Sequence, residues 1–259
     1  MSYIHLNNVS VEYSIFNAKT RSIKNLLFPM ESLSRKIINK KIGGLLNIDI
    51  NNNVKVLALS NLTLKINTGD RLGIIGHNGS GKSTLLRLLA GVYEPTSGNI
   101  DRNGLISTIF STGEGLDTES TGMDAINFHA KLHGITGSKY LLFKSDIENF
   151  TELGDYLYLP TRTYSTGMLV RLTFALATFN HNLGEILLMD EVIGAGDAHF
   201  IKKTETRMKN FLESSEIVVV ATHSMDILHK WCNKVVLLEK GSIRYYGDVK
   251  DGISLYENL

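Results

Sequence analysis

Hydrophobic residues alternate with polar ones in some segments of the chain and form continuous runs in others. Val9, Val11 and Tyr13 recur at every second position, and residues 55–66 show the same pattern before an Asn-Thr-Gly-Asp turn. This pattern predicts two strands. Three later runs are apolar almost without interruption, which is typical of parallel strands covered on both faces: residues 71–75, 185–189 and 216–221. Helical patterns separate these runs, so the sequence predicts an α/β fold.

Polar residues follow directly after each of the three apolar runs. Residues 76–84 follow the first run, Asp190 and Glu191 the second, and Thr222 and His223 the third. In open α/β sheets, ligands bind outside the carboxyl ends of the strands. We therefore expect these three segments to act at one edge of the sheet.

The segment GHNGSGKST at 76–84 fits the phosphate-loop pattern G-x-x-x-x-G-K-[ST] between a predicted strand and a predicted helix. Gly79 and Gly81 allow the backbone N–H groups to face a phosphate chain, and the helix start adds its dipole. Lys82 is expected to reach the β and γ phosphates, and Ser83 to bind Mg²⁺. The alternative is a glycine-rich turn before a helix. The predicted nucleotide-binding residues of this loop are Gly76, His77, Asn78, Gly79, Ser80, Gly81, Lys82, Ser83 and Thr84.

Three polar residues after the later strands are candidates for metal binding or catalysis, and Lys82 of the phosphate loop is a further catalytic candidate. Asp190 ends a buried strand, where an unpaired carboxylate is costly, so a metal or another cationic partner is expected, and Mg²⁺ at the phosphate loop would supply it. Glu191 is a candidate general base that orients the attacking water, although the Asp-Glu pair also fits an exposed acidic turn. His223 is a candidate sensor of the γ-phosphate, and the alternative is an ordinary structural histidine.

A second candidate anion site lies at residues 164–168, with the sequence YSTGM. Leu169, Leu172 and Leu176 follow at helical spacing, so Ser165 and Gly167 are expected at a helix N-terminus, where N–H groups attract anions. The alternative is a simple helix cap formed by Ser165 or Thr166.

Charge and composition exclude some classes of protein. The 259 residues carry 27 Lys and Arg against 26 Asp and Glu, which gives no support to general nucleic-acid binding. Cys232 is the only cysteine, so an internal disulfide framework is excluded. The start shows no secretory signal, and no run approaches the roughly 20 apolar residues of a membrane-spanning helix. A membrane role is therefore expected to be peripheral or to act through a partner.

Together, the phosphate loop, the Ser-x-Gly segment, the strand ending in Asp-Glu and the strand ending in His resemble the ATPase of ABC transporters. The resemblance implies ATP and Mg²⁺ as cofactors, a P-loop (RecA-like) core, an antiparallel β subdomain and a helical subdomain. It also implies a head-to-tail homodimer, in which the partner's copies of Ser165, Thr166 and Gly167 close over ATP. Asp197 falls at the position of the family's D-loop aspartate, which links the two sites across the dimer.

Further segments resemble bacterial exporters of lipid-linked polysaccharide: LPTRTYSTGM, MDEVIGAGDAHF at 189–200 and LLEKGSIRYYGD at 237–248. The resemblance implies export of a polyprenyl-diphosphate-linked O-antigen, capsule or teichoic acid across the inner membrane. The resemblance also implies that this chain has a separate permease dimer as its partner and is bound peripherally at the cytoplasmic face of the membrane. An ATPase for another exported substrate and a soluble ABC ATPase outside transport remain the alternatives.

We expect one ABC ATPase domain over 1–259, with an insertion at about 17–53, a helical subdomain at about 112–180 and no C-terminal carbohydrate-binding domain. Within the insertion, residues 21–41 are basic with apolar residues at helical spacing, which favours contact with a membrane surface or partner helix over a solvated loop. Ser111 departs from the family, since it falls where many ABC ATPases have a glutamine. Tyr13 or Phe16 is the candidate for stacking on adenine, and simple packing is the alternative for Tyr13.

Overall fold

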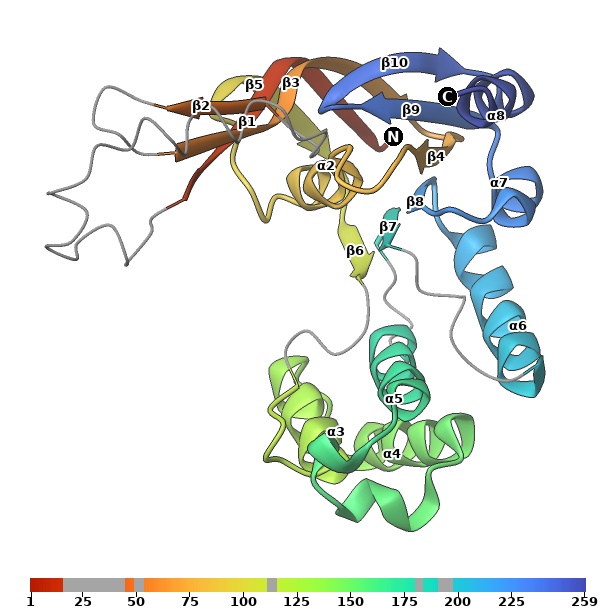
Figure 1. Cartoon of the computed structure of the whole chain (residues 1–259). Helices are drawn as coiled ribbons and strands as arrows, with labels where there is room; N and C mark the ends of the chain where they lie inside the picture. Colours follow the sequence, from red (N-terminus) through yellow and green to blue (C-terminus); the bar gives the residue numbers. More distant parts are fainter. Residues whose placement is uncertain (16–44, 49–53, 111–115, 180–183, 191–197) are drawn as a thin grey trace, which may run out of the picture. The chain divides into compact units, whose positions relative to one another are not determined.

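The computed structural model describes residues 1–15, 45–48, 54–110, 116–179, 184–190 and 198–259. The chain divides into two compact units, which are drawn in Figure 1. The first unit comprises residues 1–103 and 221–259, and the second comprises residues 104–220. Each unit has its own buried apolar side chains, so we describe the two separately.

A four-stranded antiparallel sheet with the order β2-β3-β1-β5 forms one part of the first unit. Alternating residues of the two central strands are fully buried, for example Ile4 and Leu6 in β1 and Leu64 and Ile66 in β3. Register irregularities between Leu6 and Glu12 interrupt this alternation in β1. The strands are β1 (Tyr3–Ile15), β2 (Leu45–Ile48), β3 (Val54–Asn67) and β5 (Ser97–Asn103).

The other part of the first unit surrounds the buried strand β4 (Arg71–Ile75), which pairs in parallel with β9 (Lys234–Glu239). β10 (Ser242–Gly247) returns antiparallel to β9. Ile75, Leu237 and Ile253 belong to one buried cluster, so the strand that runs into residue 76 is held by the end of the chain. The helices of this part are α2 (Lys82–Leu89), α7 (Met225–Trp231) and α8 (Val249–Glu257).

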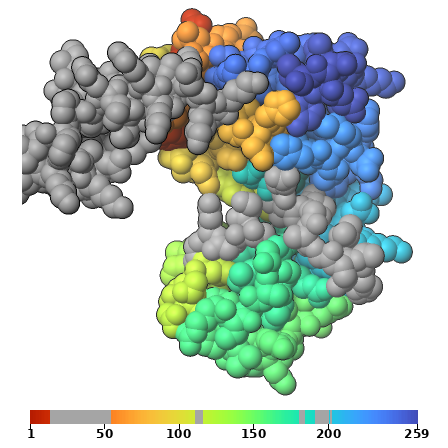
Figure 2. Space-filling model, viewed as in Figure 1, coloured from red at the N-terminus to blue at the C-terminus, as the bar shows by residue number. Residues whose placement is uncertain are grey.

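The second unit combines three strands with a group of helices. Its strands follow the order β8-β7-β6, and β6 (Ile106–Ile109) and β7 (Ile186–Asp190) are parallel. β8 (Ile217–Ala221) is buried along its whole length. The helices are α3 (Gly122–Leu132), α4 (Gly137–Thr151), the short η3 (Gly154–Tyr158) and η4 (Thr161–Thr163), α5 (Thr166–Thr178) and α6 (Ala198–Ser214). The atoms of α3, α4 and α5, green in Figure 2, form one closely packed block.

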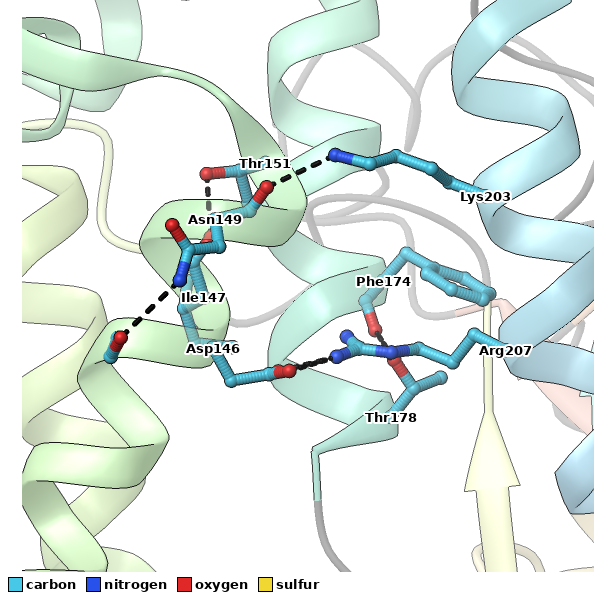
Figure 3. A network of polar contacts seen from close by, with 9 residues as sticks. Asp146, Ile147, Asn149, Thr151, Phe174, Thr178, Lys203 and Arg207 are labelled. Carbon is cyan, nitrogen blue, oxygen red and sulfur yellow. Dashed lines mark hydrogen bonds and ion pairs between the residues drawn. The ribbon is translucent and has the colours of Figure 1, made fainter.

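A polar network ties three helices of this second unit together (Figure 3). Arg207 of α6 forms an ion pair with Asp146 of α4, and its guanidinium lies 4.0 Å from the ring centre of Phe150. The same side chain reaches the Thr178 hydroxyl of α5. Lys203, one turn earlier on α6, donates to the Asn149 carbonyl over 3.0 Å. These contacts fix α6 against the block that carries the YSTGM segment.

The α/β class and the positions of the predicted strands are confirmed. The apolar runs at 71–75, 185–189 and 216–221 correspond to β4, β7 and β8, each within one residue. Most of the predicted insertion at 17–53, including residues 21–41, lies outside the described residues. Helices α3, α4 and α5 fall within residues 112–180, but the single-domain boundaries stay a prediction. Among the described helices, none combines the length and the apolar character that crossing a bilayer requires.

Candidate functional site

The backbone between β4 and α2 has a shape that only glycine permits at several positions. Gly76, Gly79 and Gly81 have φ angles of 146°, 79° and 108°, a region that residues with a Cβ rarely adopt. Crowding adds to the requirement at Gly76, because a Cβ there would lie 2.3 Å from the carbonyl oxygen of Leu238. The loop is therefore built for a close approach to its backbone, which suits phosphate binding.

The same loop holds a positively charged side chain beside the start of a helix. Gly81 precedes α2 without any side-chain cap, so the amide groups at the helix start have no capping side chain. The Lys82 ammonium donates to the carbonyl oxygens of Gly76 and His77 over 2.7 and 3.2 Å. His77, Asn78 and Gly79 are the exposed residues in the middle of the loop. A cationic group and a helix N-terminus thus meet on an accessible turn, which fits the binding of a phosphate chain.

The last residues of the loop, from Ser80 to Thr84, differ in how exposed they are. Ser80 is 5% exposed, and its hydroxyl finds no hydrogen-bond partner among the described residues. Ser83 is exposed, and Thr84 is half-buried beside it. The Ser83 hydroxyl is therefore accessible to a ligand, as its predicted role in binding Mg²⁺ requires.

Tyr13, the candidate for adenine stacking, lies against the start of α2. Its ring contacts the Tyr93 ring edge-on at 5.4 Å between centroids. Burial raises the pKa of Tyr13, and a hydrogen bond with the Thr84 side chain opposes this rise. Tyr13 therefore packs beside the phosphate loop and remains half-buried. Phe16, the alternative candidate, lies outside the described residues.

His223 follows β8, near the start of the segment 221–259 that belongs to the first unit. The N–H of its neighbour Thr222 donates to the Ile74 carbonyl of β4 over 3.3 Å. The Thr222 hydroxyl in turn accepts from the Ser224 N–H over 3.0 Å, and Ser224 caps α7. The half-buried His223 thus follows a residue that is bonded to the strand leading into the phosphate loop.

Residues 164–168 form a capped helix start in the second unit. The Ser165 hydroxyl accepts from the Met168 N–H over 3.3 Å, so Ser165 is the cap of α5. A Cβ added at Gly167 would meet only that hydroxyl, at 4.0 Å, so the backbone here is open. Tyr164 is 8% exposed, and its hydroxyl donates to the Tyr156 carbonyl over 2.6 Å. Ser165 therefore forms the helix cap that was the alternative interpretation of this segment, and the anion-binding role of Ser165, Thr166 and Gly167 stays a prediction.

Of the other residues singled out in the sequence, the structure describes Asp190 alone. Asp190 is the half-buried last residue of β7, whose four preceding residues are buried. Glu191, Asp197 and Ser111 lie outside the described residues. The predicted roles of Asp190, Glu191 and Asp197 therefore stay predictions, and Ser111 has no assigned role.

Sequence reasoning missed the residues that enclose the phosphate loop from other parts of the chain. Gly241 of the β9–β10 turn donates its N–H to the Ser80 carbonyl over 2.9 Å. Ala58 of β3 also approaches, because its carbonyl oxygen would lie 3.0 Å from a Cβ at Gly81. The sequence LEKGSI predicts a tight turn but contains no signal for its contact with a loop about 160 residues earlier.

The fold and the loop geometry define a P-loop nucleotide-binding protein. Residues 59–194 match the ABC transporter family model. The O-antigen export system ATP-binding protein RfbE of Yersinia enterocolitica is 41% identical over 94% of this chain and 97% of its own length. This chain belongs to the ABC transporter family and is an ATP-binding subunit with the family's ATPase fold.

Two further curated relatives differ in how much of their length the chain covers. The teichoic acids export ATP-binding protein TagH of Staphylococcus haemolyticus is 31% identical over 99% of this chain and 88% of its own length. The O-antigen export system ATP-binding protein RfbB of Myxococcus xanthus is 37% identical over 78% of this chain. This chain spans only 47% of that relative.

Solved structures support the same fold. A dimeric post-hydrolysis state of an ATP-binding cassette bound to ADP and Pi aligns with a TM-score of 0.66. It is 19% identical and covers 95% of this chain and 98% of that one. At this identity, the match shows the ABC ATPase fold alone.

Proposed function

We propose that this protein is the ATPase subunit of an exporter of lipid-linked polysaccharide, such as an O-antigen, capsule or teichoic acid. The observation that carries this proposal is the 41% identity to an O-antigen export ATP-binding protein over nearly the full length of both chains. The relative named for teichoic acid export supports the same substrate class. One relative is named for O-antigen export and the other for teichoic acids export, so we propose a substrate of this class for this chain.

ATP is the proposed nucleotide, and the phosphate loop is its proposed binding site. The Gly-rich backbone and Lys82 hold the phosphates, because amide groups and an ammonium stabilise their negative charge. Ser83 and Asp190 are the proposed ligands of Mg²⁺, which neutralises charge on the β and γ phosphates when bound. Tyr13 provides the proposed aromatic surface for adenine, and its position beside Thr84 supports this role.

Glu191 and His223 are the proposed residues for hydrolysis. Glu191 orients a water molecule and accepts its proton, and His223 detects the γ-phosphate. Ser165, Thr166 and Gly167 act on the nucleotide of a second copy of the chain in a head-to-tail homodimer, with Asp197 between the two sites. The open backbone at Gly167 supports this role, since a phosphate requires close access to a helix start.

The proposed partner is a separate membrane-spanning permease dimer, with this subunit peripheral at the cytoplasmic face of the inner membrane. Nucleotide-driven closing and opening of the ATPase dimer then provides the motion for export. The basic segment at 21–41 is the proposed contact with the permease or the lipid surface, because lysine and arginine alternate there with apolar residues.

The proposal is tested by deleting the gene in its host and restoring it with three versions of the chain. These are the wild type, Lys82→Ala, and Lys209→Ala as a matched control whose side chain is 74% exposed. Surface polysaccharide and polyprenyl-linked glycan inside the cell are measured together. The deletion strain and the strain with Lys82→Ala are expected to accumulate internal glycan and to lose the surface polymer.

The wild type and Lys209→Ala are expected to restore the surface polymer. A deletion strain with a normal surface and no trapped glycan would contradict the polysaccharide substrate. Restoration by Lys82→Ala would contradict the role of ATP binding in export. The two failures are therefore distinguishable.

A further inference from the structure

The turn between β9 and β10 contacts the phosphate loop through the backbone. Glu239 pairs with Ser242, so the turn consists of Lys240 and Gly241 alone. Their φ angles of 49° and 81° are both left-handed, as a tight type I′ turn requires. Gly241 therefore sits at the tip of a rigid hairpin.

Gly241 forms two backbone hydrogen bonds, one with the phosphate loop and one with β3. Its N–H donates to the carbonyl of Ser80 in the phosphate loop over 2.9 Å. Its own carbonyl accepts from the Ser60 N–H of β3 over 2.8 Å. The turn thus joins the phosphate loop to the antiparallel sheet.

The fit around this contact leaves no room for a side chain. A Cβ at Gly241 would lie 2.5 Å from the Ala58 carbonyl oxygen, and real Cβ atoms essentially never approach so closely. A Cβ at Gly81 would lie 2.9 Å from a methyl carbon of Leu59 and 3.7 Å from the Gly241 Cα. The loop is therefore clamped between β3 and the hairpin tip.

The clamp sets the orientation of one peptide unit in the loop. The Ser80 carbonyl and the Gly81 N–H belong to the same planar, trans peptide, so they point in opposite directions. Because the carbonyl is held toward Gly241, the Gly81 N–H is directed away from the hairpin. An amide whose direction is fixed in advance binds an anion without the cost of ordering the loop.

We propose that Gly241 is a positioning residue for nucleotide binding, which holds the Ser80–Gly81 peptide in the orientation that receives the phosphate chain. This inference rests on the proposed function of the loop as the ATP site. It predicts that the hairpin affects recognition of the phosphates and not of the base.

The test compares Gly241→Ala with the matched control Gly69→Ala. Gly69 lies in the β3–β4 turn of the same unit with a similar φ of 89°, but a Cβ there would meet nothing within 4 Å. Both variants acquire a Cβ at a left-handed position, and only Gly241→Ala disturbs the clamp. Binding of ATP and of inorganic triphosphate is measured by calorimetry in EDTA, together with thermal unfolding.

Gly241→Ala is expected to weaken the binding of ATP and triphosphate by the same factor, about tenfold or more. Gly69→Ala is expected to change both affinities by less than about twofold. A folded Gly241→Ala protein with the affinities of Gly69→Ala would overturn the inference. A wild-type protein that binds neither ligand would overturn the proposed function instead.

A second measurement on the wild type covers the case in which Gly241→Ala does not fold. Hydrogen exchange of the Gly241 amide is followed by NMR with and without ATP in EDTA, with the Gly69 amide as reference. ATP is expected to slow exchange at Gly241 by about tenfold or more while Gly69 stays within about twofold. Equal responses of the two amides would overturn the inference.

Discussion

Tyr164, the first residue of the YSTGM segment, offers a quantitative test of how the segment is held. A Cβ at Gly122 would lie 2.3 Å from the Tyr164 hydroxyl oxygen, 3.1 Å from a methyl carbon of Leu157 and 3.3 Å from the Leu157 carbonyl oxygen. The hydroxyl is therefore the principal obstacle to a side chain at the start of α3. The prediction concerns Gly122→Ala, Tyr164→Phe and the double variant.

The structure gives a magnitude for each change. Tyr164→Phe removes the hydrogen bond to the Tyr156 carbonyl, which still accepts from the Leu159 N–H. It also removes the oxygen that accepts from the N–H of the buried Gly122. Because a buried donor loses its partner, we expect a loss of about 1–3 kcal/mol in the free energy of unfolding. Gly122→Ala forces the side chain and the helix start apart, at a cost of about 1–3 kcal/mol. In the double variant the hydroxyl is gone, so the two losses are expected to overlap by about 1 kcal/mol or more.

Urea unfolding followed by circular dichroism measures these free energies for the wild type and the variants. Tyr158→Phe is the matched control, because Tyr158 is 60% exposed. Its combination with Gly122→Ala is expected to be additive within about 0.3–0.5 kcal/mol. Additive losses for Gly122→Ala and Tyr164→Phe would refute the reasoning, since the hydroxyl would then not be what restricts the helix start.

Two further predictions concern titratable groups. Burial, with a smaller effect of the neighbouring His133, lowers the pKa of His129 from 6.5 to about 4. The unfolded chain therefore binds more protons between these values, so stability should fall as the pH falls from about 6.5 toward 4. His129→Gln should reduce this dependence in urea unfolding at pH 7.5 and 5, and an unchanged dependence would contradict the assignment. Burial also raises the pKa of Cys232 to about 12, although Arg71 opposes the rise. A maleimide at pH 7.5 should therefore label Cys232 at least about tenfold more slowly in the folded protein than in urea, and equal rates would show that burial does not protect it.

The elements that carry the chemistry could be predicted from the sequence because their signals are local. The apolar runs ending at Ile75 and Met189 follow from burial on both faces, and the glycine spacing before Lys82 follows from the demands of a phosphate chain. The cap at Ser165 was visible as the alternative to an anion site, since a hydroxyl before an apolar helix predicts it. The interrupted alternation near Val11 could not be predicted from the sequence, because the irregularities between β1 and β3 arise from pairing with a distant strand.

By itself, the sequence determined the fold class, the phosphate loop and the family, because each depends on residue types at short, fixed spacings. Only the tertiary structure decided what surrounds that loop. Tyr93 reaches Tyr13 and Gly241 reaches Ser80 across long stretches of chain, through ring packing and backbone hydrogen bonds. A backbone N–H carries no mark of residue type, so its partner depends on how the chain is folded and not on any local pattern.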